Sequence, residues 1–203
     1  MRQPRIVGLG GSLKEPSSSL SALEAALAAC REAGAETEIL RIGSLDLPLY
    51  APGIEPTADA VRLAESAAAA DGLIWSSPLY HGSISGSFKN AVDWLQLIAD
   101  RDPPYLSGKP IGLIATAGGV QGLQAVNTMD FVVRALRGWS VPLVIPVARA
   151  SQAFARDGTI TDPAVAEQLR SLGVEVVRAA RQLADRGSCD YAQHRSGADS
   201  LDI

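Results

Sequence analysis

Short apolar segments alternate along the chain with longer segments of helical periodicity, and this alternation occurs five times. Residues 72–76 are apolar on both faces, which is typical of a strand buried inside a parallel sheet. In the first helical segment, Leu20, Leu23 and Leu27 fall on one face. The predicted strands are residues 5–9, 36–42, 72–76, 111–115 and 141–147, and the predicted helices are residues 20–33, 57–70, 86–99, 122–137 and 162–185.

Local signals mark where two of these helices end and begin. Gly34 follows the first helix at the position where glycine commonly ends one. Asp162 and Pro163 are a capping residue and a proline in the first turn, which predicts the start of the last helix. From residue 186 the chain is polar and has little periodicity. We therefore expect one domain, residues 1–185, followed by a flexible tail, residues 186–203.

The alternation of strands and helices predicts the architecture and the place of the ligand. Strands separated by helices pair in parallel through right-handed crossovers, which gives an α/β fold with a helix layer on each face of the sheet. Ligands of such sheets bind beyond the carboxyl ends of the strands. The loops after the first, third and fourth predicted strands are therefore the candidate site.

Composition and charge exclude several classes of protein. The chain has 203 residues, of which 47% are hydrophobic and 20% charged, as in ordinary globular proteins. A net charge of -4 gives no basic surface for nucleic acid or an anionic membrane, and we expect neither partner. No segment predicts a signal peptide or a membrane span. The two cysteines, Cys30 and Cys189, form no Cys-x-x-Cys pair, so a reducing cytoplasm is expected.

The loop after the first strand, residues 10–19, combines glycines, four serines and Lys14 just before a helix. Helix N-termini present unpaired N–H groups that bind anions, so a phosphate is the expected guest. The loop has neither the dinucleotide fingerprint nor the Walker sequence, which favours the monophosphate of a mononucleotide. The alternative is that the serines only cap the helix, although capping explains one serine and not four.

The other two loops have features of a site for a flat ligand. In residues 77–85, Pro78 is expected to stiffen a turn, Gly82 allows a close approach of the backbone, and Tyr80 offers a stacking face. His81 is either a general base or, as we favour, a solvated residue at the rim. In residues 115–122, consecutive glycines can form an N–H nest for an anion.

Metal and hydrolase chemistry find no support in the sequence. The histidines and cysteines are scattered singly, and no Gly-x-Ser-x-Gly elbow occurs. Three of the 18 basic residues are lysines: Lys14 lies in the first loop, Lys89 is spaced to pair with Asp93 on a helix, and Lys109 has no predicted role.

Three segments together resemble the NADPH-dependent FMN reductase family. They are Gly11 to Lys14 with Ser17 and Ser19, the stretch 77–90 with Asp93 and Trp94, and residues 115–119. The resemblance covers roughly residues 5–180. It implies a flavodoxin-like three-layer sandwich with a five-stranded parallel sheet in the order 2-1-3-4-5, FMN as cofactor, and NADPH or NADH as co-substrate.

The resemblance also implies roles for individual residues. The FMN phosphate would be held by Ser12, Lys14, Ser17, Ser18, Ser19 and Leu20. The isoalloxazine ring would be lined by Pro78, Leu79, Tyr80, His81, Gly82 and Ser83, and its pyrimidine edge would face Thr116, Ala117, Gly118 and Gly119. Lys89 and Asp93 would be subunit contacts of a homodimer or homotetramer.

The function that follows is hydride transfer from a nicotinamide to N5 of FMN, with electrons passed on to free flavin, a quinone, a metal oxyanion or an azo acceptor. Because the cofactor carries the chemistry, no catalytic side chain and no metal are expected. The alternative is a non-enzymatic flavodoxin-like electron carrier or redox-sensing FMN-binding module, which would bind FMN without turning over NAD(P)H.

Overall fold

Five parallel strands form the sheet in the computed structural model, which describes residues 2–186. Their order is β2 (Glu36–Arg41), β1 (Arg5–Gly10), β3 (Gly72–Tyr80), β5 (Pro110–Thr116) and β6 (Trp139–Val147). A short antiparallel strand, β4 (Ser83–Ile84), pairs with the end of β3. The predicted order 2-1-3-4-5 is confirmed, because the five predicted strands are β1, β2, β3, β5 and β6; β4 was not predicted.

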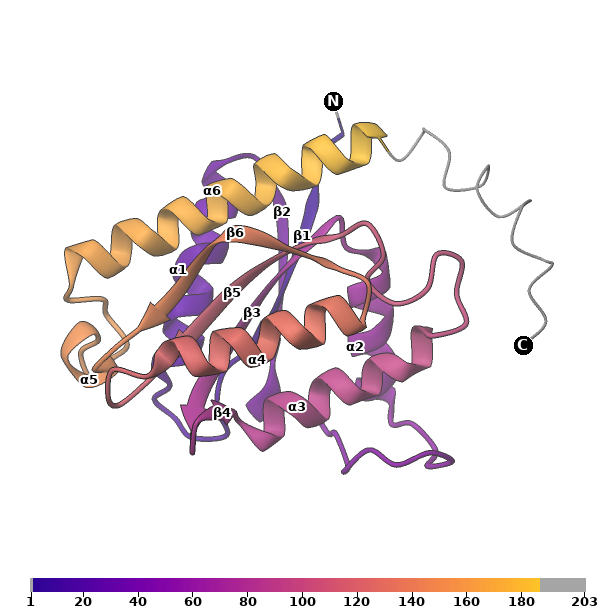
Figure 1. Ribbon diagram of the computed structural model, residues 1–203, viewed down its shortest axis with the longest axis horizontal. Coiled ribbons are helices and arrows are strands. Elements are labelled where there is room, and N and C mark those ends of the chain that lie inside the picture. The colour runs from indigo at the N-terminus through magenta and orange to yellow at the C-terminus, as the bar shows by residue number, and fades with distance from the viewer. Residues whose placement is uncertain (1, 187–203) are drawn as a thin grey trace.

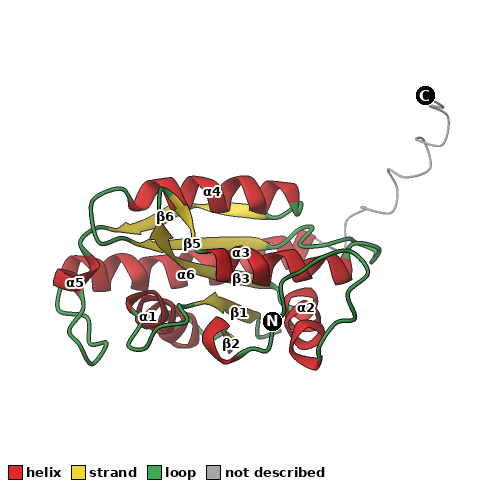
Figure 2. Cartoon of the chain, turned by 90° about the horizontal axis from the view of Figure 1, so that it is seen from below, coloured by secondary structure: helices red, strands yellow, loops and turns green. Residues whose placement is uncertain are grey.

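Helices cover both faces of the sheet (Figures 1 and 2). They are α1 (Ser18–Glu32), α2 (Ala58–Ala69), α3 (Gly86–Asp93), α4 (Gly122–Ala135), α5 (Ala150–Ala153) and α6 (Pro163–Arg186), and 3-10 turns span Ile42–Ser44 and Trp94–Ile98. The predicted tail begins at Arg186, which is the last residue of α6, and otherwise lies outside the described residues. No helix within residues 2–186 has both the length and the apolarity that a bilayer crossing needs.

Two apolar clusters fill the space between the sheet and its helices. Successive residues of a strand face opposite sides, so Ile74 and Trp75 of β3 belong to different clusters. Ile74 packs in the cluster that contains α1 and α6, and Trp75 packs in the cluster that contains α2, α3 and α4. The sheet is therefore buried on both faces, as the apolar strands predict.

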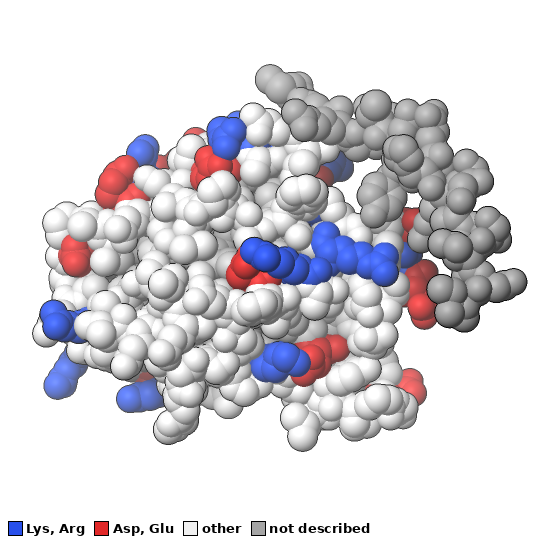
Figure 3. Space-filling model, in the orientation of Figure 1, with Lys and Arg blue, Asp and Glu red and all other residues white. Residues whose placement is uncertain are grey.

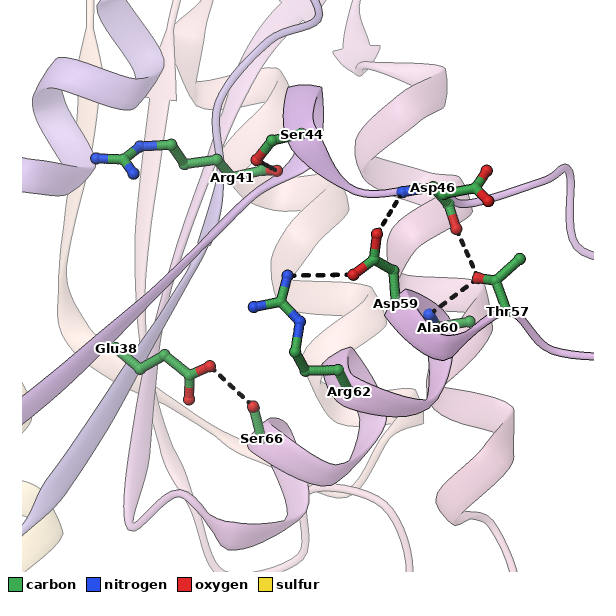
Figure 4. A network of polar contacts seen from close by, with 9 residues as sticks. All are labelled: Glu38, Arg41, Ser44, Asp46, Thr57, Asp59, Ala60, Arg62 and Ser66. Carbon is green, nitrogen blue, oxygen red and sulfur yellow. Dashed lines mark hydrogen bonds and ion pairs between the residues drawn. The ribbon is translucent and has the colours of Figure 1, made fainter.

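Side-chain hydrogen bonds hold the irregular segment between β2 and α2 in place (Figure 4). The Asp59 carboxylate accepts a hydrogen bond from the Asp46 amide at 2.8 Å, and the Thr57 hydroxyl donates to the Asp46 carbonyl at 2.6 Å. Thr57 also caps α2 by accepting from the Ala60 amide at 3.2 Å. The start of α2 and the preceding segment are therefore one connected unit.

Two segments differ from the prediction by more than a shift of one or two residues at an end. The predicted helix 86–99 is α3 followed by a tighter 3-10 turn from Trp94, whose indole N–H donates to the Pro48 carbonyl at 2.9 Å. The predicted loop 77–85 is wrong for its first part, because β3 continues to Tyr80. Ser77 looks like a loop residue in the sequence, but its buried hydroxyl accepts from the Ser85 amide and donates to the Pro78 carbonyl, which satisfies it inside the sheet.

The expected turn at Pro78 is also wrong. Pro78 lies within β3 and pairs with Thr116 of β5. On the other side β1 ends opposite Ser76, so the proline has a strand neighbour on one side only. Proline is tolerated in a sheet at such places, because its missing N–H does not interrupt ladders on both sides.

Candidate functional site

The three predicted loops meet at the carboxyl edge of the sheet. Their parent strands β1, β3 and β5 are neighbours, and the register sets Gly10 beside Ser76 and Pro78 beside Thr116. The Ser12 hydroxyl lies 3.5 Å from the Tyr80 hydroxyl, which connects the first loop to the end of β3. The chain runs from β1 to β2 in one direction and from there back to β3, so this is the switch point at which such sheets bind ligands.

The first loop leads directly into α1. Ser17 is the N-cap, and its hydroxyl accepts from the Leu20 amide at 3.2 Å and lies 3.2 Å from the Ser19 hydroxyl. Both serines are buried. Capping therefore accounts for Ser17, and the Leu20 amide is already bonded within the protein.

Two amides at the start of α1 are left for an anion. Ser18 and Ser19 are the first residues of the helix, and their amides donate to no group within residues 2–186. Lys14 is exposed and has no ion-pair partner in that part of the chain, and its own amide donates to the Ser12 hydroxyl at 3.1 Å. Unpaired amides at a helix start, with a lysine in the loop that leads into that helix, are the donor set that a phosphate monoester requires.

A tight hairpin forms the middle of the site. Tyr80 pairs with Ser83, and the two residues between them, His81 and Gly82, have φ angles of 48° and 83°. Positive φ at both central positions is the type I′ turn, which requires residues that tolerate the left-handed region. Gly82 is therefore needed for the turn itself, and not only for close approach to a ligand.

The hairpin presents its polar residues outward. Tyr80 is 51% exposed, and His81 and Gly82 are exposed, whereas Pro78 is buried and Leu79 is half-buried. The Ser83 hydroxyl lies 3.4 Å from the Thr128 hydroxyl of α4. No hydrogen bond within the described residues orients the His81 imidazole, so a general base held by a partner group is not present there.

The loop after β5 is tied to the segment after β6. The Ala117 amide donates to the Val147 carbonyl at 2.9 Å, and the Arg149 amide donates to the Gly119 carbonyl at 2.8 Å. Thr116 is the buried last residue of β5, while Gly118 and Gly119 are exposed. Neither glycine has a positive φ, so the left-handed form of the expected N–H nest is absent. The sequence did not predict that residues 147–150 border the site.

Other reactive groups lie apart from this edge. Burial raises the pKa of the Cys30 thiol to about 12, and the thiol donates to the Gly173 carbonyl between α1 and α6, so it is not a nucleophile. Within residues 2–186, no three His, Cys, Asp or Glu side chains are grouped as metal ligands. A cavity of about 280 Å³ at the amino ends of β5 and β6, lined by Trp139, Glu175 and Arg178 among others, is at the opposite end of the sheet.

Comparison with known proteins supports the fold and identifies the family of the chain. Residues 4–152 match the family model described as NADPH-dependent FMN reductase. The chain is 35% identical over 193 residues to the NADPH-dependent FMN reductase ArsH of Acidithiobacillus ferrooxidans, covering 95% of this chain and 79% of the relative. It is 37% identical over 112 residues to an FMN-dependent NADPH-azoreductase of Staphylococcus aureus, covering 53% and 56%.

A solved structure of a flavoenzyme has the same fold. FerB, a flavoenzyme NAD(P)H:(acceptor) oxidoreductase from Paracoccus denitrificans, superposes with a TM-score of 0.69 at 25% identity, over 88% of this chain and 98% of FerB. The predicted flavodoxin-like fold, the enzyme class and FMN as cofactor with a nicotinamide co-substrate are thereby confirmed. The chain belongs to the NADPH-dependent FMN reductase family.

Proposed function

We propose that the carboxyl edge described above is the FMN site of an NAD(P)H-dependent reductase. The observation that carries this proposal is that the Ser18 and Ser19 amides at the start of α1, and the Lys14 ammonium in the loop before it, have no partner within residues 2–186. This donor set fits a phosphate. The exposed Tyr80 lies at the end of β3, and its hydroxyl is next to the Ser12 hydroxyl of the first loop. When bound, FMN supplies the redox chemistry by accepting a hydride from NAD(P)H and passing electrons to a second substrate.

The protein's own residues then bind and orient. Lys14, Ser12 and the helix amides would hold the phosphate, and the Tyr80 to Ser83 hairpin would support the ring from β3. The loop Thr116 to Gly119, fixed by its bonds to residues 147–150, would face the pyrimidine edge. No side chain of this edge has to exchange a proton, which accounts for a site without an oriented base.

The second substrate is a small-molecule electron acceptor. The azoreductase among the relatives makes azo dyes the first acceptors to test, with free flavin, quinones and metal oxyanions after them. We place the protein in the cytoplasm, where NADPH is present.

We further propose that the chain forms a homodimer or homotetramer. Helix α4 carries Leu123 and Phe131, which are 50% and 73% exposed, and Val120 just before it is 65% exposed. Apolar side chains gathered on one helix near a ligand site suit a contact between subunits. Lys89 and Asp93 pair with each other at 2.6 Å within one chain, so a role in that contact would involve the pair. Light scattering after size-exclusion chromatography measures the oligomer; a monomer at all concentrations would contradict it.

The test of function is NAD(P)H oxidation by protein reconstituted with FMN, followed with a panel of acceptors. We expect FMN-dependent oxidation of NADPH or NADH that an acceptor accelerates. A protein that binds FMN but oxidises neither nucleotide would be an electron carrier or redox sensor instead.

A further inference from the structure

Arg149 stands directly behind the loop that borders the proposed flavin site. Its backbone is left-handed, with φ 46° and ψ 51°, a conformation that costs a residue other than glycine about 1–3 kcal/mol. Two bonds fix it there: its amide donates to the Gly119 carbonyl at 2.8 Å, and the next amide, of Ala150, donates to the Ala117 carbonyl at 2.9 Å. The side chain therefore projects from a rigid position at the carboxyl end of β6.

The Arg149 guanidinium has no partner in the described part of the chain. It is exposed and makes no ion pair or hydrogen bond within residues 2–186. Most arginines of this part do have partners; Arg5 pairs with Glu38 and Arg178 with Glu175. Figure 3 shows several basic side chains that protrude from the end of the molecule at which Figure 1 shows α5. This helix begins at Ala150, directly after Arg149.

The order of the strands separates Arg149 from the proposed FMN phosphate. The phosphate donors follow β1, the hairpin follows β3, the glycine loop follows β5, and Arg149 follows β6. Three strand spacings lie between β1 and β6, or roughly 14 Å. This exceeds the Debye length of roughly 8 Å at physiological ionic strength, so a second phosphate near Arg149 would be little repelled by the first.

A second exposed arginine, Arg156, lies in the segment between β6 and α6, but on the side of α1. Arg156 belongs to the turn closed by the Phe154–Ile160 bridge, and this turn packs against α1: a Cβ added at Gly158 would lie 2.7 Å from the Ser21 hydroxyl. Arg156 is therefore on the side of the proposed FMN phosphate, which leaves Arg149 as the cation on the β6 side.

We propose that Arg149 binds the 2′-phosphate of NADPH and so sets the preference for NADPH over NADH. The inference rests on the proposed function, in which the hairpin after β3 and the loop after β5 hold the flavin ring that the nicotinamide has to reach. The proposed FMN phosphate lies on the β1 side of these loops, so a dinucleotide that extends toward β6 keeps its own phosphates apart from it. A guanidinium binds a phosphate monoester through two parallel hydrogen bonds, and NADH has no such group.

The test substitutes Arg149→Asn, because asparagine adopts the left-handed backbone and lacks the charge. With the FMN-loaded protein, we expect KM for NADPH to rise at least about tenfold, as loss of a charged hydrogen-bonding partner does, and KM for NADH to stay within about twofold. Calorimetric titration of the same variant with 2′,5′-ADP should show an affinity reduced at least about tenfold, and with 5′-AMP an unchanged one.

Arg137→Asn is the matched control. Arg137 is also exposed, left-handed with φ 63° and unpaired within residues 2–186, but it precedes β6 at the amino end of the sheet. This variant should keep the wild-type ratio of kcat/KM for the two nucleotides. An unchanged ratio in Arg149→Asn, or a wild-type enzyme that uses only NADH, would overturn the inference while leaving the proposed function intact. A wild-type protein that oxidises neither nucleotide would instead contradict the function itself.

Discussion

The three lysines show how differently one residue type is used in this chain. Lys89 makes an exposed pair with Asp93, as its spacing predicts. The Lys14 ammonium is unpaired within residues 2–186 and lies in the loop before α1, where the sequence predicts a phosphate. Lys109 had no predicted role, and this expectation was wrong: its ammonium donates to the Ala68 carbonyl at 2.8 Å and to the Ala70 carbonyl, at the end of α2. Spacing along one helix is visible in a sequence, whereas a contact across 41 residues is not.

Lys109→Met should lower the free energy of unfolding by about 1–3 kcal/mol, because two carbonyls at the end of α2 lose their donor. Burial lowers the pKa of this ammonium, and the negative charge of Asp71 opposes that shift. Lys89→Met, the control, should change stability by at most about 0.5 kcal/mol. Urea unfolding of both variants measures the difference; equal effects would contradict the role given to Lys109.

Lys14→Ala should weaken FMN binding about 10- to 100-fold, since it removes a charged donor from a dianionic phosphate. Fluorescence titration with FMN measures the affinity, and Lys89→Ala serves as a control for the loss of one positive charge. Lys14→Arg should retain binding, because the guanidinium also pairs with phosphate. Unchanged affinity in Lys14→Ala would leave Lys14 as an ordinary surface residue.

At the scale of elements, the sequence predicted the long helices, whose periodic pattern extends over many residues. It did not predict the short elements, whose structure depends on two or three residues. Each long helix was placed within a few residues of its observed bounds. The β3–β4 hairpin was missed because its turn, His81-Gly82, differs from the usual Asn-Gly signal, and because Ser77 and Pro78 look like a loop. Helix α5 has four residues, which is too short for any periodicity to show.

The packing of α1 on α6 depends on Gly173. A Cβ at this position would lie 2.4 Å from the Ala26 carbonyl oxygen and 2.8 Å from the Ala29 Cβ, so the helices would have to move apart. Gly173→Ala should therefore destabilise the protein by about 1–2 kcal/mol, although alanine is more favourable than glycine inside a helix by about 1 kcal/mol. Thermal unfolding measures this, with Ser171→Ala on the exposed face of α6 as control. A Gly173→Ala variant as stable as wild type would contradict the close approach.

Asp59 links α2 to the segment before it, and its carboxylate should make the free energy of unfolding depend on pH in the acidic range. The Asp46 amide holds the pKa of this carboxyl below its ordinary value of 3.8, with a further contribution from Arg62. The folded state therefore binds its proton less readily than the unfolded state, and the stabilisation is present above pH 3.8 and is lost as the pH falls through the lower, folded-state value. The stability difference between wild type and Asp59→Asn should narrow over that range in acid. A difference that is constant with pH would contradict the ionised role.

At the scale of the whole molecule, the alternation of strands and helices was enough to predict a doubly wound sheet and the edge that binds a ligand. The strand order sets β1, β3 and β5 side by side, so residues as far apart in the chain as Ser12 and Gly119 lie at one edge without any signal in the sequence for their pairwise contacts. The sequence could not show that the segment after β6 borders this edge, because the amides of Arg149 and Ala150 hold it there through backbone bonds that every residue type except proline can make.

The central claim is that this edge binds FMN in a position to accept a hydride from a nicotinamide. Anaerobic mixing of the FMN-loaded protein with NADPH, observed through the visible absorption of the flavin, tests it directly. The account predicts that the absorption bleaches in a single-turnover reaction and returns when an acceptor is added. Protein-bound flavin that keeps its absorption with both NADPH and NADH would contradict it.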